Sequence, residues 1–290
     1  MLNLIFRKLT TVSYSSQYNI VSIFCSARSA NTMQIATWNV NSLNVRLPHV
    51  LGWLAENPVD FLCLQELKMV DEKFPLAALQ EAGYDAVFAG QKTYNGVAIL
   101  RRIARTPAAV ATQINLPTFA DEQKRVIAAT YGDVRVICAY FPNGQAVGSE
   151  KFAYKMAWLA GLQTWLQAEL TQYPKMVFVG DFNIAPDDRD VYDPVEWAGQ
   201  IHCSEEERTA FKNLLALPLH DAFRHLEAGD KHYSWWDYRQ MAFRRNRGLR
   251  IDHILVSDAL LPHVSRCWID KTPRKLEQPS DHTPVIVEIN

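Results

Sequence analysis

Three short polar clusters in this sequence contain the side chains that bind metal ions and move protons in proteins. They are Leu64-Gln65-Glu66, Gly180-Asp181-Phe182-Asn183 and Ser280-Asp281-His282. Each cluster lies beside an apolar run, and such runs are typical of buried strands. Acids and an imidazole at several strand ends can converge in one pocket, which is costly unless a cation or a reaction requires it.

The amides and carboxylates have the spacing expected of ligands to a hard metal ion. Asn39 and Asn41 share one face of an extended strand because side chains alternate along it, and Asp181 and Asn183 are also two residues apart. Glu66 follows a buried run and is a candidate ligand for Mg²⁺, which takes oxygen ligands. Each feature alone has an ordinary structural explanation, such as a turn or a surface ion pair, but their joint occurrence does not.

Two further acids can support a proton-transferring group. Asp252 lies inside an otherwise apolar strand segment, and Asp281 directly precedes His282. A neighbouring carboxylate can orient an imidazole and fix its tautomer, so we expect Asp281 to orient His282.

The segment that begins at Trp235 combines cations with flat rings. Its cations are Arg239, Arg244, Arg245, Arg247 and Arg250, and its rings are Trp235, Trp236, Tyr238 and Phe243. Cations contact phosphates and rings stack on bases, so the segment is a candidate nucleic-acid contact, with a solvated basic loop over core aromatics as the alternative. Further candidates for phosphate contact are Lys92, Lys151 and Lys155.

The apolar patterns predict the elements that must position these residues. Helices are expected over 46–56, over 149–173 and from Ser204 onward, where Ser204-Glu205-Glu206-Glu207 has capping-box spacing. Strands are expected over 34–38, 60–65, 84–89, 96–100, 125–131, 134–140, 176–180, 251–256 and 284–289. Strands outnumber long helices, and the regular strand–helix alternation of a doubly wound fold is missing. We therefore predict an α/β (α+β) fold of two packed, mainly antiparallel mixed sheets flanked by helices, in one domain over 33–290.

The composition is that of a globular protein without a global charge preference. Hydrophobic residues make up 48% and charged residues 21% of the chain, and the formal net charge is −1. Any nucleic-acid binding must therefore come from a local patch. The five Cys include no CxxC pair, which indicates buried thiols in a reducing compartment rather than disulfides or a zinc site.

Residues 1–32 differ from the rest because they contain no Asp or Glu and many Ser and Thr. We expect an N-terminal extension that is disordered or not native, since Met33 opens directly into a strand-like segment. An acid-free, Ser-rich leader can also be a targeting peptide, and its apolar stretch is too short to span a bilayer.

The motifs taken in order resemble the exodeoxyribonuclease III family of the endonuclease/exonuclease/phosphatase superfamily. They are Trp38-Asn39-Val40-Asn41, Leu64-Gln65-Glu66, Tyr140-Phe141-Pro142-Asn143-Gly144, Gly180-Asp181-Phe182-Asn183, Trp235-Trp236-Asp237-Tyr238-Arg239, Gly248-Leu249-Arg250-Ile251-Asp252 and Pro279-Ser280-Asp281-His282. The resemblance covers all of 33–290 and implies the DNase I-like four-layered α/β sandwich. The acid and amide motifs are shared across the superfamily, whereas the Trp-Asp-Tyr-Arg and Gly-Leu-Arg-Ile-Asp segments point to its DNA-repair branch.

The resemblance implies a role for each matched residue of the metal site. Glu66 would be the principal metal ligand, with Asn39 and Asn41 completing or orienting the shell. Asp181 would position or deprotonate the attacking water, and Asn183 would hold that water or the phosphate.

The resemblance also implies how the phosphate is held. Tyr140 would hydrogen-bond a non-bridging phosphate oxygen, and Asp252 would support His282 or the metal shell. His282, oriented by Asp281, would contact the scissile phosphate. Family mechanisms differ on whether this His or the Asp at position 181 is the base, and we take Asp181.

Three positions depart from the family pattern. Trp236 stands where a Phe is common, which changes the stacking surface little, and Asn143 stands where a Gln is frequent in a DNA contact. His202 lies in a region that faces DNA in relatives. We hypothesise that His202 crowds the opposite strand or an extruded abasic sugar, which would shift activity from abasic-site incision towards 3′-end processing.

The resemblance implies a DNA-repair nuclease that depends on Mg²⁺, with Mn²⁺ as the other candidate ion. The expected activities are 3′→5′ exonuclease on duplex DNA, 3′-phosphatase and abasic-site incision. A divalent cation offsets the repulsion between an anionic nucleophile and a phosphodiester. The alternatives are a phosphatase or phosphodiesterase of the same superfamily acting on inositol phosphates or lipids, which the Arg and Trp segment disfavours, and a DNA-binding module without catalysis.

The expected partner is double-stranded DNA with 3′ ends, 3′ phosphates or abasic sites, and no membrane. The family suggests a monomer. We expect a cytoplasmic, nucleoid-associated protein, with organellar targeting by residues 1–32 left open.

Overall fold

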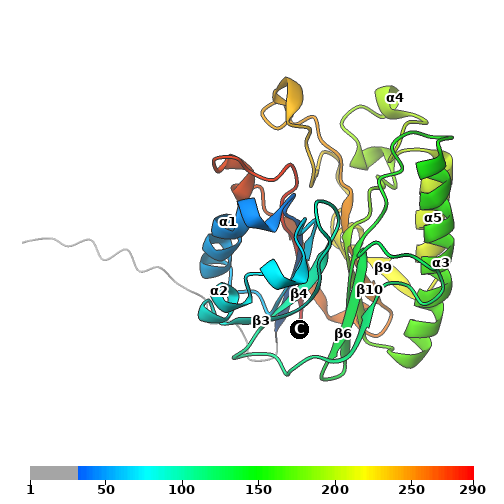
Figure 1. Ribbon diagram of the computed structural model, residues 1–290. Coiled ribbons are helices and arrows are strands. Elements are labelled where there is room, and N and C mark those ends of the chain that lie inside the picture. Colours follow the sequence, from blue (N-terminus) through cyan, green and yellow to red (C-terminus); the bar gives the residue numbers. More distant parts are fainter. Residues whose placement is uncertain (1–31) are drawn as a thin grey trace, which may run out of the picture. The chain divides into compact units, whose positions relative to one another are not determined.

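The structure is a computed structural model that describes residues 32–290. The predicted N-terminal extension therefore falls, apart from Thr32, outside the described residues. Within them the elements form four layers, in which two sheets pack face to face and helices cover both outer faces (Figure 1). This confirms the predicted sandwich.

The first sheet has six strands. In spatial order they are β11 (Val264–Ile269), β12 (Val285–Ile289), β1 (Met33–Asn39), β2 (Phe61–Gln65), β4 (Val97–Arg102) and β3 (Tyr84–Ala89). Its outer face packs against helices α1 (Leu43–Glu56) and α2 (Leu76–Glu81). Leu54 of α1 and Leu79 of α2 are buried in that layer.

The second sheet also has six strands. In spatial order they are β5 (Val110–Ile114), β6 (Val126–Tyr131), β7 (Val134–Tyr140), β8 (Met176–Asp181), β10 (Asp252–Ser257) and β9 (Leu219–Asp221). Its outer face packs against α3 (Glu150–Gln172) and α5 (Glu205–Leu215). Shorter elements are α4 (Pro194–Trp197), α6 (Ala222–Leu226) and 3-10 turns at Asp71–Lys73, Asp188–Asp190, Arg239–Met241, Leu261–His263 and Thr272–Lys275.

The predicted strands agree with the structure to within two residues at each end. The predicted capping box is confirmed, because the Ser204 side chain accepts from Glu207 N and the Glu207 side chain accepts from Ser204 N. The patterns missed β5, β9 and β11. β5 is an edge strand with mostly exposed residues, β9 has three residues, and β11 is an edge strand with an irregular register.

The described cysteines are free, and three of them are buried while Cys267 is partly exposed. This agrees with the expectation of thiols rather than disulfides for the part of the chain that the structure covers. Within the same residues, none of the helices has the length and apolar character needed to cross a membrane.

Each sheet of the described chain contains one parallel strand pair, and these pairs set the place of the polar clusters. β1 runs parallel to β2 with Asn39 opposite Gln65, and β7 runs parallel to β8 with Tyr140 opposite Asp181. The carboxyl ends of parallel strands meet at one edge, so Asn39 meets Glu66, which follows Gln65, and Tyr140 meets Asp181.

Antiparallel neighbours bring two more polar residues to the same edge. β10 pairs with β8 so that Asp252, at its start, lies opposite Asp181. β12 pairs antiparallel with β1, and His282 lies just before β12. An antiparallel strand that begins at this edge therefore adds its first residues to the carboxyl ends of its neighbours.

Gly180 permits the close approach of β7 and β8 at this edge. A Cβ at this position would lie 1.8 Å from the carbonyl oxygen of Ala139, and the backbone has a φ of +152°. No other residue fits there without moving one strand, and the moved strand would carry Tyr140 or Asp181 with it.

Arg250 is not a surface cation, which corrects its prediction as a DNA contact. Its side chain is buried, its Nε donates to Asp190 Oδ1 at 2.7 Å, and its Nη1 lies 2.8 Å from Asp221 Oδ2. A buried guanidinium is tolerated only when it is paired and hydrogen-bonded, and two carboxylates far away in the sequence supply the partners. Arg250 thus ties β9 and the 188–190 turn to the start of β10.

We predict that Arg250→Met destabilises the protein by about 3–5 kcal/mol, because it leaves buried carboxylates without their main partner. Urea unfolding measures this free energy. Arg266→Met, an exposed position on β11, is the control and should change stability by about 0.5 kcal/mol or less. Equal effects for the two variants would contradict the structural role.

Candidate active site

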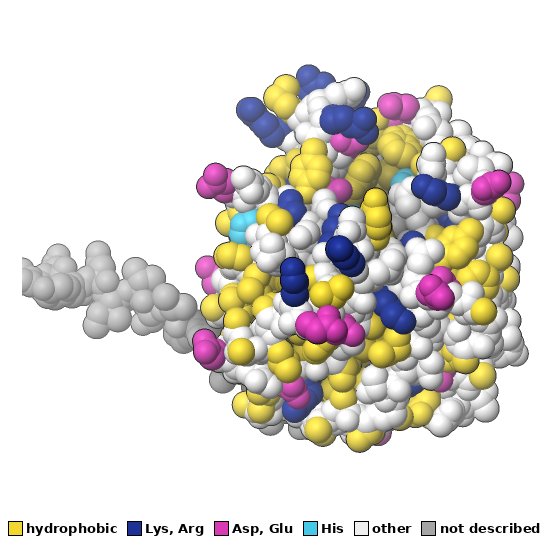
Figure 2. Space-filling model, viewed as in Figure 1, with side chains coloured by type: hydrophobic (Ala, Val, Ile, Leu, Met, Phe, Trp, Pro, Cys, Tyr) yellow, Lys and Arg dark blue, Asp and Glu magenta, His cyan; other side chains and the backbone are white. Residues whose placement is uncertain are grey.

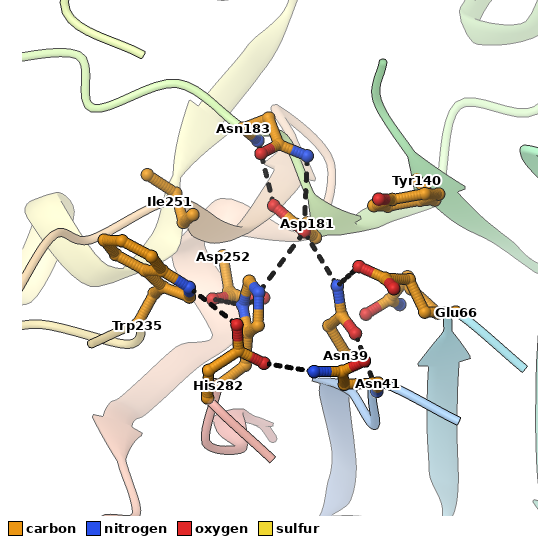
Figure 3. Close-up of polar contacts among 12 residues, drawn as sticks. Asn39, Asn41, Glu66, Tyr140, Asp181, Asn183, Trp235, Ile251, Asp252 and His282 are labelled. Atoms are coloured by element: carbon orange, nitrogen blue, oxygen red, sulfur yellow. Dashed lines mark hydrogen bonds and ion pairs between the residues drawn. The ribbon is translucent and has the colours of Figure 1, made fainter. Parts of the chain in front are cut away.

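The amide of Asn39 joins the two sheets at the edge where their polar clusters meet (Figure 3). Its Nδ2 donates to Glu66 Oε1 and to Asp181 Oδ2, both at 2.9 Å. Glu66 follows β2 of the first sheet and Asp181 ends β8 of the second. The structure therefore brings these three predicted residues together.

Asn41 continues this network away from the strand. Its backbone N–H donates to Asn39 Oδ1 at 2.9 Å, and its Nδ2 donates to Asp281 Oδ1 at 3.0 Å. Its φ of 44° is in the left-handed region, where Asn is one of the better tolerated residues. The turn directs the Asn41 amide towards the third cluster.

A small hard cation fits between Glu66 and its neighbours. The ammonium of Lys68 lies 2.7 Å from Glu66 Oε2 and 2.5 Å from Asn41 Oδ1, so a positive charge already bridges these oxygens. The other available ligand atoms are carboxylate and amide oxygens, which suit Mg²⁺. Among the described residues, Asp181, Asp252 and His282 also form a group whose ligand atoms lie within 4.8 Å of one another.

Asp181 is buried and held by the backbone that follows it. Asn183 N donates to Asp181 Oδ1 at 2.9 Å, with Asn183 in the left-handed region at a φ of 51°. Burial raises the pKa of Asp181 to about 7, and the negative charges of Asp252 and Glu66 act in the same direction. A carboxylate with this pKa can take up a proton at neutral pH.

His282 is oriented by Asp252 rather than by Asp281, which corrects the prediction. His282 Nδ1 lies 2.9 Å from Asp252 Oδ2, and His282 Nε2 lies 3.6 Å from Asp181 Oδ2. Burial alone would lower the pKa of His282, but the carboxylates of Asp252 and Asp181 outweigh it and raise the pKa to about 10. His282 is therefore positively charged at neutral pH.

Asp281 instead accepts hydrogen bonds from Trp235 and Asn41. Its Oδ2 accepts from Trp235 Nε1 at 3.0 Å and its Oδ1 accepts from Asn41 Nδ2 at 3.0 Å. Both Asp281 oxygens are engaged by these two donors, and the residue lies in a bend just before β12. Asp281 thereby holds the indole of Trp235, which Figure 3 shows beside Asp252 and His282.

Tyr140 lies beside Glu66 and Asp181. Burial and these two carboxylates raise the pKa of its hydroxyl well above 10, so Tyr140 stays a hydrogen-bond donor. The guanidinium of Arg125 lies 5.1 Å from the centre of the Tyr140 ring. Arg125 was not among the predicted site residues, since its sequence signal is only a basic residue directly before the buried strand β6.

A cavity of about 680 Å³ opens beside Tyr140. Its lining includes Tyr94, Arg125, Tyr140, Asn143, Lys151 and Tyr154. The predicted DNA contacts Asn143 and Lys151 thus lie together next to the catalytic edge. Lys92 lines another cavity, of about 510 Å³, with Lys68 and Lys73.

The Arg-rich segment forms a loop that projects at the top of Figures 1 and 2, where Lys and Arg side chains gather. Its exposed cations are Arg239, Arg244, Arg245 and Arg247. Trp235 reaches the site, but Trp236 is fully buried and packs edge-on against Phe243. Trp236 is therefore a core residue and offers no stacking surface, contrary to the prediction.

His202 and Lys155 are both buried. His202 Nδ1 lies 2.8 Å from the carbonyl oxygen of Asn183, and its ring centre lies 6.4 Å from those of Trp197 and Trp235. Burial lowers the pKa of His202 to about 4, so the ring is neutral at pH 7.

Lys155 pairs with Glu207, and the prediction that it contacts phosphate is wrong.

Comparison with known proteins shows which family has this fold. A model described as the Endonuclease/Exonuclease/phosphatase family matches residues 36–282. The chain is 38% identical to exodeoxyribonuclease III of Haemophilus influenzae, over 88% of this chain and 99% of that protein. A solved structure described as the 3′ phosphatase NExo from Neisseria, bound to a product DNA hairpin, is 50% identical with a TM-score of 0.86, over 89% of this chain and 99% of that one. An AP endonuclease from Archaeoglobus fulgidus is 36% identical with a TM-score of 0.84, over 89% and 99% of the two chains.

These matches cover the segment in which the sequence motifs occur and share its sandwich fold. They confirm the resemblance on which the expected fold and site were based. The chain belongs to the Endonuclease/Exonuclease/phosphatase family and, within it, to the exodeoxyribonuclease III group.

Proposed function

We propose that this protein is a Mg²⁺-dependent DNA-repair nuclease that removes nucleotides and phosphate groups from the 3′ ends of duplex DNA. Family membership makes the chain a hydrolytic enzyme. The choice of 3′ ends follows from two relatives, one named an exodeoxyribonuclease III and one described as a 3′ phosphatase bound to a product DNA hairpin.

One observation carries the proposal. Asn39 holds Glu66 of one sheet and Asp181 of the other at 2.9 Å each. Tyr140, which lies beside both acids, lines a cavity that Lys151 and Arg125 also line. Acids that would bind a cation and cations that would bind a phosphate backbone are thus adjacent. A phosphodiester is the substrate that needs both.

Asp181 is the group that accepts the proton of the attacking water. Its pKa of about 7 lies close to the working pH, which is the most effective value for a general base. Asn39 and the Asn183 N–H hold the carboxylate from two sides, so the direction of attack is fixed before substrate binds.

The negative charge that builds on the phosphate oxygens is met by donors already in place. His282 is protonated, Tyr140 keeps its hydroxyl proton, and the Asn183 amide lies beside Asp181. Preorganised donors of this kind stabilise the transition state without reorganising during the reaction. Glu66 and the Asn41 amide oxygen would hold the metal ion, and Asn39, whose amide nitrogen donates to Glu66, would orient that carboxylate. The ion would supply further neutralisation of the phosphate charge.

We predict that the protein shortens a duplex with a recessed 3′ end and dephosphorylates a duplex with a 3′-phosphate in the presence of Mg²⁺. EDTA should reduce both reactions to background, and excess Mg²⁺ should restore them, because the acids need a cation to face a phosphodiester. Labelled oligonucleotides resolved on denaturing gels give the measurement. Release of phosphate from phosphoinositides but not from these duplexes would instead favour the lipid or inositol phosphate alternative.

Glu66→Gln and Asp181→Asn test the catalytic roles separately from binding. Each should lower kcat by about 10²–10⁴-fold, because one loses a metal ligand and the other the general base. DNA affinity, measured by fluorescence anisotropy in EDTA, should stay equal or rise, since each variant removes a negative charge. Variants that fold, bind DNA and keep their turnover would rule out these roles.

The position of His202 supports the proposal that 3′-end processing dominates over abasic-site incision. Its ring centre lies 6.4 Å from that of Trp235, whose indole is hydrogen-bonded to Asp281. We propose that a sugar turned out of the duplex would need room on this side of the site. The bond from its Nδ1 to the Asn183 carbonyl fixes the ring in that place. A bulky, rigid side chain there selects against an extruded abasic sugar.

We predict that His202→Gly raises the ratio of abasic-site incision to 3′-phosphatase activity by about tenfold. The φ of His202 is 72°, a conformation that Gly adopts readily, so the variant should fold. His220→Gly, at a partly exposed position on β9 that contacts Asp258, is the control and should leave the ratio unchanged. An unchanged ratio in His202→Gly would remove this explanation of specificity.

A further inference from the structure

Lys155 is a buried cation that none of the steps above uses. It lies on α3, its side chain has no exposure, and its Nζ lies within hydrogen-bond distance of three oxygens. These are Glu207 Oε1 at 2.5 Å, the Asn183 carbonyl at 2.7 Å and the Asn143 carbonyl at 3.3 Å. An ammonium has three N–H donors, so all of them are engaged and none remains for a phosphate.

Two of these acceptors belong to the loops that carry the reaction. Asn183 follows β8 and Asn143 follows β7, and the Asn143 Nδ2 donates to Asn183 Oδ1 at 3.2 Å. Lys155 therefore contacts the main chains of two residues whose side chains also contact each other. One ammonium sets the spacing of both loops.

Asn183 links Lys155 to the general base Asp181. Asn183 accepts from Lys155 through its carbonyl and donates through its own N–H to Asp181 Oδ1 at 2.9 Å. Asn183 has a left-handed φ of 51°, a conformation that Asn tolerates better than most residues, and the contacts on both sides of the residue hold it there. The carbonyl and the N–H of Asn183 belong to successive peptide units that meet at its Cα. A change in the φ and ψ of Asn183 that moved the carbonyl away from Lys155 would therefore also redirect the N–H that holds Asp181.

Glu207 holds Lys155 in this position. Its Oε1 contacts Lys155, and its Oε2 accepts from Ser204 Oγ at 2.7 Å and from Ser204 N at 3.1 Å. The capping box of α5 therefore fixes the acid as well as the start of the helix. A buried ion pair gives little net stability, because well-packed apolar residues of similar volume often serve as well. Apolar residues cannot, however, donate to two carbonyls.

We propose that the Lys155–Glu207 pair is a positioning clamp that holds Asn183 and Asn143, and through Asn183 the base Asp181, in the geometry that hydrolysis requires. Lys155 touches neither substrate nor reacting atoms in this role. The inference rests on the proposed function, because its effect is seen in turnover. In this role α3, which carries Lys155, and α5, which carries Glu207, help to align the base from the outer face of the second sheet.

The test compares Lys155→Met with the double variant Lys155→Met/Glu207→Leu, using a duplex with a 3′-phosphate. Lys155→Met should lose stability, because it leaves Glu207 buried and unpaired. The double variant should regain part of the lost stability, since no buried charge is left unpaired, although α5 loses the Glu207 half of its capping box. In both variants kcat should fall by about 10–100-fold, the size expected for a misplacement of about 1 Å, while KM and DNA Kd change less than about twofold.

Lys151→Met is the matched control on the same helix. Lys151 is exposed and lines the cavity beside Tyr140, so its loss should raise DNA Kd and KM more than it lowers kcat. Lys155→Arg keeps the charge but moves the donors, because a guanidinium is planar and larger, so its kcat should also fall with Kd unchanged. If neither Met variant folds, Lys155→Arg decides the question alone.

Two results would overturn the clamp. A double variant, or Lys155→Arg, with wild-type kcat would show that the carbonyl contacts do not align the base. A rise in DNA Kd with unchanged kcat in the Lys155 variants would make Lys155 a phosphate contact. Wild-type protein without turnover on the duplex would refute the proposed function itself, which is a separate outcome from either of these.

Discussion

The position of the site depends on one constraint, the pairing of parallel strands at the edge where both sheets end. β1 with β2 and β7 with β8 bring Asn39, Glu66, Tyr140 and Asp181 to that edge from segments that are far apart in sequence. The absence of a side chain at Gly180 lets β7 and β8 approach closely enough for the register to hold. The rest of the site is built outward from these four residues by amides and turns.

Charged side chains are concentrated at the same edge, where they shift one another's pKa values and form ion pairs. Asp252 and Glu66 raise the pKa of Asp181, and the carboxylates of Asp252 and Asp181 keep His282 charged although burial opposes this. Lys68 partly neutralises Glu66 and donates to the amide oxygen of Asn41. A pocket that holds a cationic imidazole next to a carboxylate of raised pKa is suited to a polyanionic substrate. The electrostatics and the strand topology therefore point to the same chemistry.

The fold and most of the site were predictable because their signals are local. Apolar runs predicted the long strands, and polar clusters at the strand ends predicted Glu66, Asp181 and His282 as site residues. The errors arose where a partner is distant in sequence. Arg250 and Lys155 look like surface cations until Asp190, Asp221 and Glu207 are brought to them by the fold. Adjacency in the sequence was misleading for Asp281 and His282, because the Asp281 oxygens bind Trp235 and Asn41. The imidazole is held by Asp252, which lies 30 residues away in the sequence. Short or exposed edge strands carry too few buried residues to produce a pattern.

The division of the site between two sheets has a consequence for how activity is lost. Glu66 and Asn39 belong to one sheet and Asp181 and Tyr140 to the other, and what keeps them together is the hydrophobic layer between the sheets, which includes Ile35, Val97, Val179 and Ile254. Each half retains its own ladder of hydrogen bonds if that layer loosens. Inactivation by heat or denaturant can thus precede the loss of secondary structure, and the catalytic assay becomes the most sensitive probe of interior packing.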